Sequence, residues 1–354
     1  MPDPVTTTPL ADHGPEHAPD RAPEGGPGRQ SALHRIAAAT LRMTGSRAFK
    51  VAFVLVAAGL GGYAVISQWA QVKTDLGKLG VVAIGEALVS VLVAWFAMMM
   101  VWRILLAASG SRLPVRGASR VFFVGQLGKY LPGSVWPVLA QMELGRAYRV
   151  PRQRSATVAV LAMVVSLASA LLVALATLPF LGSGTTAGYR WAFLLVPVLL
   201  LCLHPRVLNP AIGRLLRAAR RPEPEQPLSG RAIAAAMGLG CLTWVLAGLH
   251  IWLLVVRLGA TAGHSLPVAI GAFAFAWSVG FVIVFAPAGA GVRELILIAA
   301  LTPVLHSAGA ATVVALVSRL VTILADLIAA ALSAWLGRLG ASSGPVQSDD
   351  SPAA

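Results

Sequence analysis

Seven apolar runs dominate this chain, and their lengths constrain its fold more than any other feature. A helix of about 20 consecutive apolar residues crosses the roughly 30 Å hydrocarbon core of a bilayer. Inside that core only helices and closed barrels satisfy their own backbone groups, and runs of this length favour helices. We therefore predict an all-α, polytopic membrane helix bundle of about seven or eight spans. The runs cover residues 49–69, 79–106, 155–181, 190–203, 232–256, 266–286 and 310–336.

Composition supports a membrane protein and argues against a nucleic-acid-binding one. Hydrophobic residues make up 57% of the chain and charged residues only 12%, whereas soluble domains carry about 25% charged residues. The net charge of +14 comes mainly from arginines that cluster between the apolar runs, as in cytoplasmic loops under the positive-inside rule. We predict a multi-pass protein of the cell membrane, the inner or plasma membrane, that contacts lipids and no nucleic acid.

The same basic clusters predict which side of the membrane each loop occupies. Arg35, Arg42 and Arg47 precede the first apolar run, so the N-terminus is predicted to be cytoplasmic. The segment 204–231 holds six arginines and is also predicted to be cytoplasmic. Residues 182–189 contain no basic side chain and are predicted to lie outside.

Domain limits follow from where the apolar runs begin and end. Residues 46–338 form the predicted transmembrane domain, whose halves, 46–203 and 232–338, are joined by the arginine-rich linker. The tails at 1–45 and 339–354 contain few large apolar side chains. Such segments cannot bury enough surface to offset the entropy of ordering, so we predict that both tails are disordered.

Two segments rich in proline and glycine, 120–145 and 287–306, do not fit as simple spans, and both are predicted to be re-entrant. Basic residues flank the first one on both sides, so a re-entrant hairpin explains its charges better than a crossing does. Pro132 and Pro287 are 155 residues apart, and each follows two candidate spans. Paired interruptions of this kind suggest a two-fold internal repeat and indicate a transport site. The pattern leaves open whether the two halves are parallel or inverted.

Charged side chains at membrane depth cost about 2.5–3.5 kcal/mol each on insertion scales and usually serve a function. Arg319 and Asp326 lie two helical turns apart, about 10 Å along the axis, so each is expected to meet a group on another segment. The alternative is that these charges only neutralise one another between helices. The predicted substrate-binding residues are Gln126, Lys129, Pro132, Gly133, Pro287, Gly289, Gly291, Arg293, Glu294, Arg319 and Asp326.

Other polar residues in the apolar runs are assigned packing or interfacial positions. His250 lies beside Trp252 in an apolar run and is predicted to be a packing histidine. Glu86 is expected near the outer interface, and Trp102 in an interfacial aromatic belt. Glu143 is a further charged candidate at membrane depth.

No motif for catalysis or metal binding is present. The sequence lacks the nucleophile-elbow, zinc-protease, phosphate-loop and dinucleotide-binding patterns. Cys202 and Cys241 both lie within apolar runs, without the spacing of a zinc site or a disulfide framework. We therefore predict no catalytic residue, no metal and no cofactor, and a protein that is not an enzyme.

Two motifs resemble a known family. Residues 285–294 read FAPAGAGVRE, which is similar to the P-x-G-x-G-x-R-E signature of the flippase-like family that includes the membrane half of lysylphosphatidylglycerol synthases. Residues 129–137 read KYLPGSVWP and resemble that family's earlier Y-x-P-G element. The resemblance covers about residues 45–338. It implies lipid translocation or an accessory role, and no aminoacyl-transferring domain is expected.

The leading hypothesis is movement of an anionic or phosphate-bearing lipid or glycolipid between leaflets. Lys129 and Arg293 would hold the phosphate through charge-assisted hydrogen bonds, while the acyl tails stay in the bilayer. Two alternatives remain open at this point. One is a non-transporting membrane partner of an envelope glycosyltransferase or synthetase, and the other is a membrane enzyme that acts on polyprenyl lipids.

Overall fold

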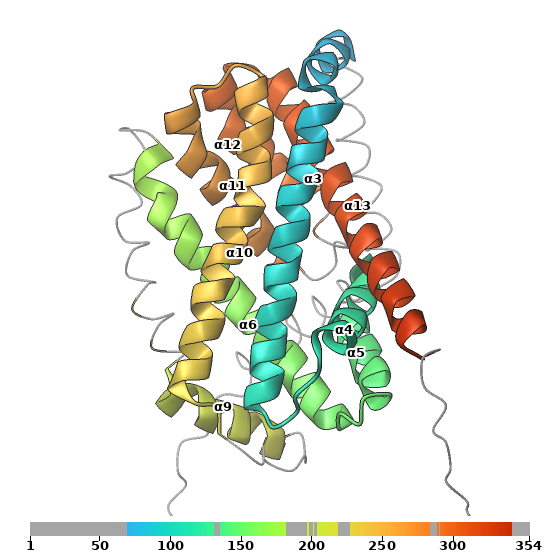
Figure 1. Ribbon diagram of the computed structural model, residues 1–354. Helices are drawn as coiled ribbons and strands as arrows, with labels where there is room; N and C mark the ends of the chain where they lie inside the picture. Colours follow the sequence, from blue (N-terminus) through green and yellow to red (C-terminus); the bar gives the residue numbers. More distant parts are fainter. Residues whose placement is uncertain are drawn as a thin grey trace, which may run out of the picture. The chain divides into compact units, whose positions relative to one another are not determined.

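Helices form all the regular structure in the part of the chain that the computed structural model describes, which confirms the predicted all-α class (Figure 1). The described residues are 69–130, 135–181, 197, 201, 204–218, 227–283, 289 and 291–341. The α-helices are α3 (Trp69–Ala108), α4 (Val115–Ser119), α5 (Trp136–Arg146), α6 (Arg152–Thr177), α9 (Pro205–Ala218), α10 (Gly230–Arg257), α11 (Ala262–Val282), α12 (Val292–Leu305) and α13 (Ala308–Ala341). Between them lie the π-helix η1 (Arg120–Val124) and the 3-10 helices η2 (Leu127–Tyr130) and η3 (Leu178–Leu181).

Five of the helices are long and apolar enough to cross a membrane: α3, α6, α10, α11 and α13. They coincide with the predicted runs that begin at residues 79, 155, 232, 266 and 310. The predicted spans 49–69 and 190–203 lie almost entirely outside the described residues, and so does the tail at 1–45. At the other end of the chain, α13 continues to Ala341, past the predicted boundary at residue 338.

The helices α3 and α10 run antiparallel and define the two ends of the bundle. The Ser90 hydroxyl donates a hydrogen bond to the Leu246 carbonyl at 2.7 Å. Nearer the other end of the same pair, Arg257 Nη2 lies 3.5 Å from Glu86 Oε2. The C-terminal part of α3 therefore lies beside the start of α10. We call this end the α9 end, because Asn209 of α9 hydrogen bonds both backbone groups of Leu228, just before α10 begins.

Residues 115–130 and 135–146 form two paired limbs, as expected for the first broken segment. One limb consists of α4, η1 and η2 and the other of α5, and we call the pair the first hairpin. Gly125 approaches Gln141, and Gly128 approaches the backbone of Pro137 so closely that a side chain at position 128 would collide with it. These pairings make the limbs antiparallel. The hairpin follows the end of α3, and Arg154, at the start of α6, donates to the Gly110 carbonyl at 3.2 Å. Both ends of the hairpin therefore lie at the α9 end.

A second hairpin, formed by α11 and α12, begins and ends at the opposite end of the bundle. It follows the C-terminal end of α10, where Trp252 donates to the Ala262 carbonyl at 2.9 Å. Gly289 lies against Gly280, while Arg293 covers the ring of Phe273. The 14 residues of α12 span about 21 Å at 1.5 Å per residue, so α12 runs back along α11 without crossing about 30 Å of hydrocarbon.

The two halves are therefore inverted relative to each other. In the first half, a long helix is followed by a hairpin at the α9 end and then by α6. In the second half, α10 runs antiparallel to α3, its hairpin lies at the opposite end, and α13 returns to the α9 end, where Gly337 meets Arg120. Among the described elements of the two halves, the order is the same and each direction is reversed. This arrangement answers the question that the sequence left open.

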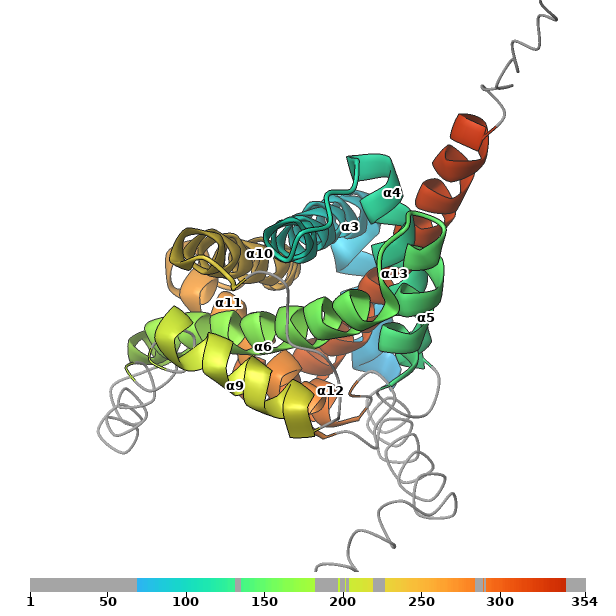
Figure 2. The same cartoon turned by 90° about the horizontal axis from the view of Figure 1, so that it is seen from below.

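The predicted linker at 204–231 contains the helix α9, which was not predicted from the sequence. The six arginines of this segment are typical of a cytoplasmic loop, but its apolar residues recur at helical spacing. In α9, Leu208 is buried while Arg206, Arg214 and Arg217 are exposed. Figure 2 shows α9 lying across the α9 end, over α6. An amphipathic helix at this position matches the boundary between the bundle and the polar surroundings.

Small residues let the helices approach closely, as is usual where lipid supplies no hydrophobic force between them. Gly248 of α10 lies against the backbone of Ile270 in α11, and Gly271 lies against Thr177 at the end of α6. Trp244 fills the space beside these contacts. It is fully buried, and its indole N–H donates to the Ser166 carbonyl at 3.0 Å.

Replacing Gly248 with alanine is expected to destabilise the protein, because the new Cβ would collide with the Ile270 backbone, which cannot rotate away. Overpacking of this kind typically costs about 1–3 kcal/mol. Gly238 lies on the same helix with nothing near the position of an added Cβ, so Gly238→Ala is the matched control and should be neutral or mildly stabilising. Thermal unfolding in detergent measures both. Equal melting temperatures for the two variants would contradict the tight α10–α11 contact.

Candidate functional site

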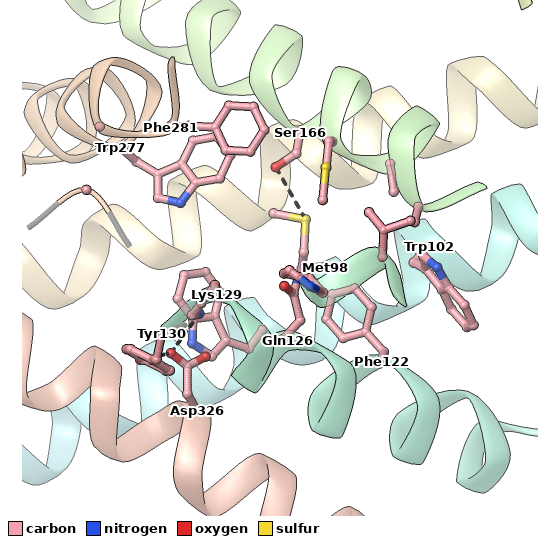
Figure 3. A pocket seen from close by; sticks show the side chains of 18 of the residues that line it. Met98, Trp102, Phe122, Gln126, Lys129, Tyr130, Ser166, Trp277, Phe281 and Asp326 are labelled. Carbon is pink, nitrogen blue, oxygen red and sulfur yellow. Dashed lines mark hydrogen bonds and ion pairs between the residues drawn. The ribbon is translucent and has the colours of Figure 1, made fainter. Parts of the chain in front are cut away.

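A cavity of about 580 Å³ lies where the two hairpins meet α3, α6 and α13. Figure 3 shows Lys129, Tyr130 and Asp326 gathered at one side of it, away from Trp102. The polar lining consists of Gln126, Lys129, Tyr130, Gln141, Ser166, Arg293, Arg319, Thr322 and Asp326. The aromatic and methionine lining consists of Trp95, Met98, Trp102, Phe122, Phe123, Met163, Trp244, Trp277 and Phe281. The cavity is therefore amphipathic, with a charged region that continues into an apolar one.

Irregular backbone in the first hairpin brings several of these side chains to the cavity. The limb begins as a π-turn at η1, changes to the tighter 3-10 turn η2, and contributes Phe122, Gln126, Lys129 and Tyr130 to the lining. A regular α-helix would present residues on one face only every three or four positions. In η2, at the end of this limb, the neighbouring residues Lys129 and Tyr130 both line the cavity. Such turns often occur at functional sites.

Asp326 of α13 ties the first hairpin to the last helix. Its Oδ2 atom lies 2.7 Å from Lys129 Nζ and accepts a hydrogen bond from the Tyr130 hydroxyl at 2.6 Å. The Asp326 side chain is 8% exposed and that of Lys129 31% exposed. The ammonium group of Lys129 also lies over the rings of Trp95 and Tyr130, at 5.6 and 5.5 Å from their centroids. Lys129 therefore gains both an ion pair and cation–π contacts.

Arg319, two turns earlier on α13, faces the second hairpin. Its Nη1 atom lies 3.6 Å from Glu294 Oε1, and the other carboxylate oxygen of Glu294 accepts from the Gly291 N–H at 2.6 Å. Gly291 has a φ of 86°, a left-handed conformation that glycine adopts without strain. Glu294 therefore caps the start of α12 while holding Arg319. The prediction that Arg319 and Asp326 meet different segments is confirmed.

Arg293 is buried in a different way from the other charged residues. It is 7% exposed, and its guanidinium carbon lies 4.5 Å from the centroid of the Phe273 ring. Its Nη2 atom is buried and has no hydrogen-bond partner among the described residues. Phe273 also contacts His250, whose ring lies edge-on to it with 4.6 Å between the ring centroids. Arg293 thus lines the cavity and carries a buried donor that the described protein groups leave unsatisfied.

His250 itself has the packing role that the sequence suggested. One ring nitrogen, Nδ1, hydrogen bonds the Ala247 carbonyl, and Nε2 lies 2.8 Å from the Ser318 hydroxyl. A carbonyl can only accept, so Nδ1 carries the proton and Nε2 accepts from Ser318. Both nitrogens are therefore satisfied, and the residue joins α10 to α13 behind the cavity.

Three further cavity residues carry unsatisfied polar atoms, and sequence reasoning missed them. The described residues contain four buried side-chain nitrogen or oxygen atoms without a hydrogen-bond partner: Trp95 Nε1, Trp102 Nε1, Gln141 Oε1 and Arg293 Nη2. All four belong to residues that line this cavity. The predicted interfacial position of Trp102 is wrong, because this side chain is only 1% exposed. Trp95 and Trp102 are seven residues apart, a spacing that places both on one face of α3.

Most of the predicted site residues come together. Gln126, Lys129, Gly289, Arg293, Arg319 and Asp326 line the cavity, while Gly291 and Glu294 form the adjoining start of α12. Pro132, Gly133 and Pro287 lie outside the described residues. Glu143, a further charged candidate, does not line the cavity: it is exposed, and its carboxylate oxygens lie 2.8 Å from Arg146 Nη1 and 2.7 Å from Arg152 Nη2. Hydrogen bonds from Arg152 and Arg146 lower the pKa of its carboxyl.

Exposed apolar side chains mark an opening of the cavity toward the sides of α5, α6 and α11. Val135, Leu139, Val160 and Phe281 all line the cavity, and all are exposed. Phe281 stacks on Trp277, with 5.0 Å between ring centroids. Among the described residues, no group of histidine, cysteine and carboxylate side chains could hold a metal ion. The arrangement offers cations, hydrogen-bond donors and an apolar opening, which suits an amphipathic anion.

Comparison with known proteins agrees with the motifs. Residues 45–330 match the family model described as the lysylphosphatidylglycerol synthase TM region. The matched range includes both hairpins and all the charged residues of the cavity. No curated protein matches the chain.

Proposed function

The chain belongs to the family of lysylphosphatidylglycerol synthase transmembrane regions, and we propose that it moves an anionic, phosphate-bearing lipid or glycolipid between the two leaflets of the cell membrane. The observation that carries the proposal is the set of unsatisfied polar atoms in the cavity. Buried polar groups are nearly always hydrogen bonded, and each exception needs an explanation. Here a bound headgroup supplies the missing partners.

The chemistry of these atoms selects the ligand. Two indole N–H groups and one guanidinium N–H group require acceptors, which phosphate oxygens provide. The oxygen of Gln141 requires a donor, which a hydroxyl of a glycerol or sugar headgroup provides. A lipid that combines a phosphate with a hydroxyl-bearing headgroup offers both kinds of partner.

The charges of the cavity favour the same ligand. Lys129, Arg293 and Arg319 contribute three positive charges, while Glu294 and Asp326 contribute two negative ones. Both carboxylates already pair with cations, but Arg293 forms no ion pair with a described residue. An incoming phosphate would therefore meet a net positive charge at a site of low dielectric, where charge interactions are strong.

The inverted hairpins support a path that is reachable from both leaflets. One hairpin starts at the α9 end and the other at the opposite end, and both contribute side chains to one cavity. The headgroup would bind at this meeting point. The exposed apolar residues at the opening would keep the acyl tails in contact with the bilayer, which avoids moving them through a polar environment.

Reconstitution tests the proposal. Vesicles would carry a trace of phosphatidylglycerol labelled on its acyl chain, and a reductant that cannot cross the membrane would bleach the outer leaflet only. With the protein present we expect nearly all the label to become accessible, whereas protein-free vesicles should keep the inner label protected. Labelled phosphatidylcholine is the headgroup control and should remain largely protected.

Two further conditions decide between this function and its rivals. The assay would be repeated with an imposed proton or sodium gradient, because movement is either passive or coupled to an ion. A folded, inserted protein that leaves the inner label protected under every condition would contradict transport. That result would favour a non-transporting partner of an envelope glycosyltransferase or synthetase, or an enzyme acting on polyprenyl lipids.

Topology provides an independent prediction. Arginines concentrate at the α9 end, which we expect to face the cytoplasm together with the N-terminus and the end of α13. In a variant lacking the native cysteines, Arg206→Cys and Thr261→Cys place one thiol at each end of the bundle. An impermeant thiol reagent added to intact cells should label position 261 and not position 206. The reverse pattern would invert the proposed orientation.

A further inference from the structure

A second cavity, of about 510 Å³, lies at the α9 end between the last turns of α3 and the first turns of α10. It shares no lining residue with the central cavity. Three arginines surround it: Arg103 on α3, Arg112 in the following turn and Arg231 at the start of α10. No aspartate or glutamate lies among its described lining residues. Three guanidinium groups without a carboxylate form a site for an anion.

Most hydrogen-bond donors of these arginines have no partner among the described residues. Arg103 uses Nε to donate to the Leu113 carbonyl at 2.9 Å, which fixes its direction and leaves four N–H donors on its terminal nitrogens. Neither Arg112 nor Arg231 forms a side-chain hydrogen bond or an ion pair with a described residue. The last carbonyls of α3 accept from the N–H groups of residues 109–111, so they do not compete for these cations.

The wall beneath the arginines is apolar. Ile104, Ala107 and Ala108 line it from α3, Leu113 from the turn, and Ala232 and Ala235 from α10. The site also lies at a defined level. The membrane-spanning part of α3 ends at Ala108, and that of α10 begins at Gly230. This is the level at which hydrocarbon gives way to headgroups, so the cations face the phosphate layer and the apolar wall faces the first methylene groups.

We propose that this cavity binds the phosphate headgroup of an anionic phospholipid from the leaflet at the α9 end, as a resident lipid distinct from the lipid that the central cavity moves. The lipid joins α3 to α10 at the point where the two inverted halves meet. Its acyl chains begin along the apolar wall of the cavity, where the alanines of α3 and α10 leave room for the first methylene groups.

Native mass spectrometry of the full chain in a neutral detergent tests this site. The probes are phosphatidylglycerol and phosphatidylcholine with the same acyl chains, and inorganic phosphate. The site variant is Arg112→Gln/Arg231→Gln. The control is Arg206→Gln/Arg214→Gln, which removes the same charge from exposed positions of α9 at the same end of the bundle. Because all four residues are exposed, both variants should melt like the wild type in the absence of lipid.

The site variant is expected to bind phosphatidylglycerol about tenfold to thirtyfold more weakly, given the usual attraction of each basic residue to anionic lipid. The control variant should bind nearly as tightly as the wild type, and phosphatidylcholine should bind weakly to all. In an Arg293→Met background one tightly held phosphatidylglycerol should remain, and its loss on adding the Arg112 and Arg231 substitutions assigns it to this cavity. This separates the result from the fate of the transport proposal.

Three outcomes would overturn the inference. Equal weakening in the control would mean general surface attraction, and no weakening in the site variant would mean that the lipid binds elsewhere. Displacement of the bound lipid by inorganic phosphate at similar concentration would show a site for a free anion instead of a lipid.

Discussion

Replacing Arg293 with methionine is expected to slow lipid movement at least tenfold while the protein stays folded. The Arg293 residue is 7% exposed, and its Nη2 atom has no hydrogen-bond partner among the described residues. Hydrogen bonds to charged groups contribute about 1.5–3 kcal/mol, which corresponds to a tenfold to hundredfold effect on a bound headgroup. Methionine supplies an unbranched apolar side chain that can pack beside Phe273, but it is shorter than arginine and offers no donor.

The stability of the same variant separates a binding role from a structural one. Arg293 forms no ion pair with a described residue, so its removal leaves no described carboxylate without its partner. A buried charge without a counterion is itself destabilising, and its replacement by an apolar residue of similar volume is often neutral or stabilising. The melting temperature of Arg293→Met should therefore equal or exceed that of the wild type.

Two further variants complete the test. Arg293→Lys keeps the charge but loses the planar fork of donors, so it should fold and lose most of the transport rate. Arg257→Met removes an arginine at the opposite end that is 49% exposed beside Glu86, and it should move lipid at the normal rate. Stable Arg293→Met protein with normal transport would exclude this residue as a headgroup ligand. Strong destabilisation would assign it to the fold instead.

Replacing Asp326 with asparagine should produce the largest loss of stability among single substitutions in the cavity. The carboxylate accepts from Tyr130 and pairs with Lys129 at 2.7 Å. Asparagine retains an acceptor for Tyr130 and removes only the charge. Breaking a fully buried pair costs about 3–5 kcal/mol. Because the Lys129 side chain is 31% exposed, water compensates in part, and we expect a loss of about 2–3 kcal/mol.

A double-mutant cycle checks the origin of that loss. Lys129→Gln/Asp326→Asn removes both charges and should recover most of the stability lost in the single variant, with a coupling energy of about 1–3 kcal/mol. Tyr130→Phe is the milder control and should cost about 1 kcal/mol, since it removes one hydrogen bond and no charge. Thermal unfolding of the wild type, the two single variants, the double variant and Tyr130→Phe in one detergent supplies the comparison. Additive effects of the Lys129 and Asp326 substitutions would contradict the ion pair.

The two ion pairs also suggest how α13 connects the hairpins. Asp326 holds the first hairpin through Lys129, and Arg319 approaches the second through Glu294. A phosphate that engages Lys129 or Arg319 would compete with these carboxylates. Ligand binding and the contact between hairpins are therefore linked, because one set of charges serves both.

The sequence alone determined the class of the fold. A bilayer requires helices of a certain length and makes buried charge unfavourable, and both rules act locally along the chain. Hydropathy therefore predicted the five described spans within a few residues, and proline, glycine and the flanking charges predicted a hairpin at 120–145, where the structure places two antiparallel limbs. The same rules selected Lys129, Arg293, Arg319 and Asp326 as candidate site residues, and all four line the cavity.

Features that depend on contacts between distant segments could not be predicted from the sequence. Trp95 and Trp102 have the apolar environment of any spanning helix, and hydropathy does not distinguish a side chain facing lipid from one facing a cavity. The partners of the charges were equally hidden, because each ion pair to α13 joins it to a different hairpin. The many arginines of the segment 204–231 predict a loop, although its apolar residues recur at helical spacing.

Only the tertiary structure decided the relation between the two halves and the state of Arg293. Both halves have the same order of apolar runs and breaks, and a run reads alike whether its helix points up or down. Packing supplies the direction, through contacts such as Ser90 with Leu246 and Gly337 with Arg120. The sequence likewise left two partners open for Glu294, Arg293 or Arg319. In the folded protein Glu294 caps its own helix and lies beside Arg319, while Arg293 forms no ion pair with a described residue.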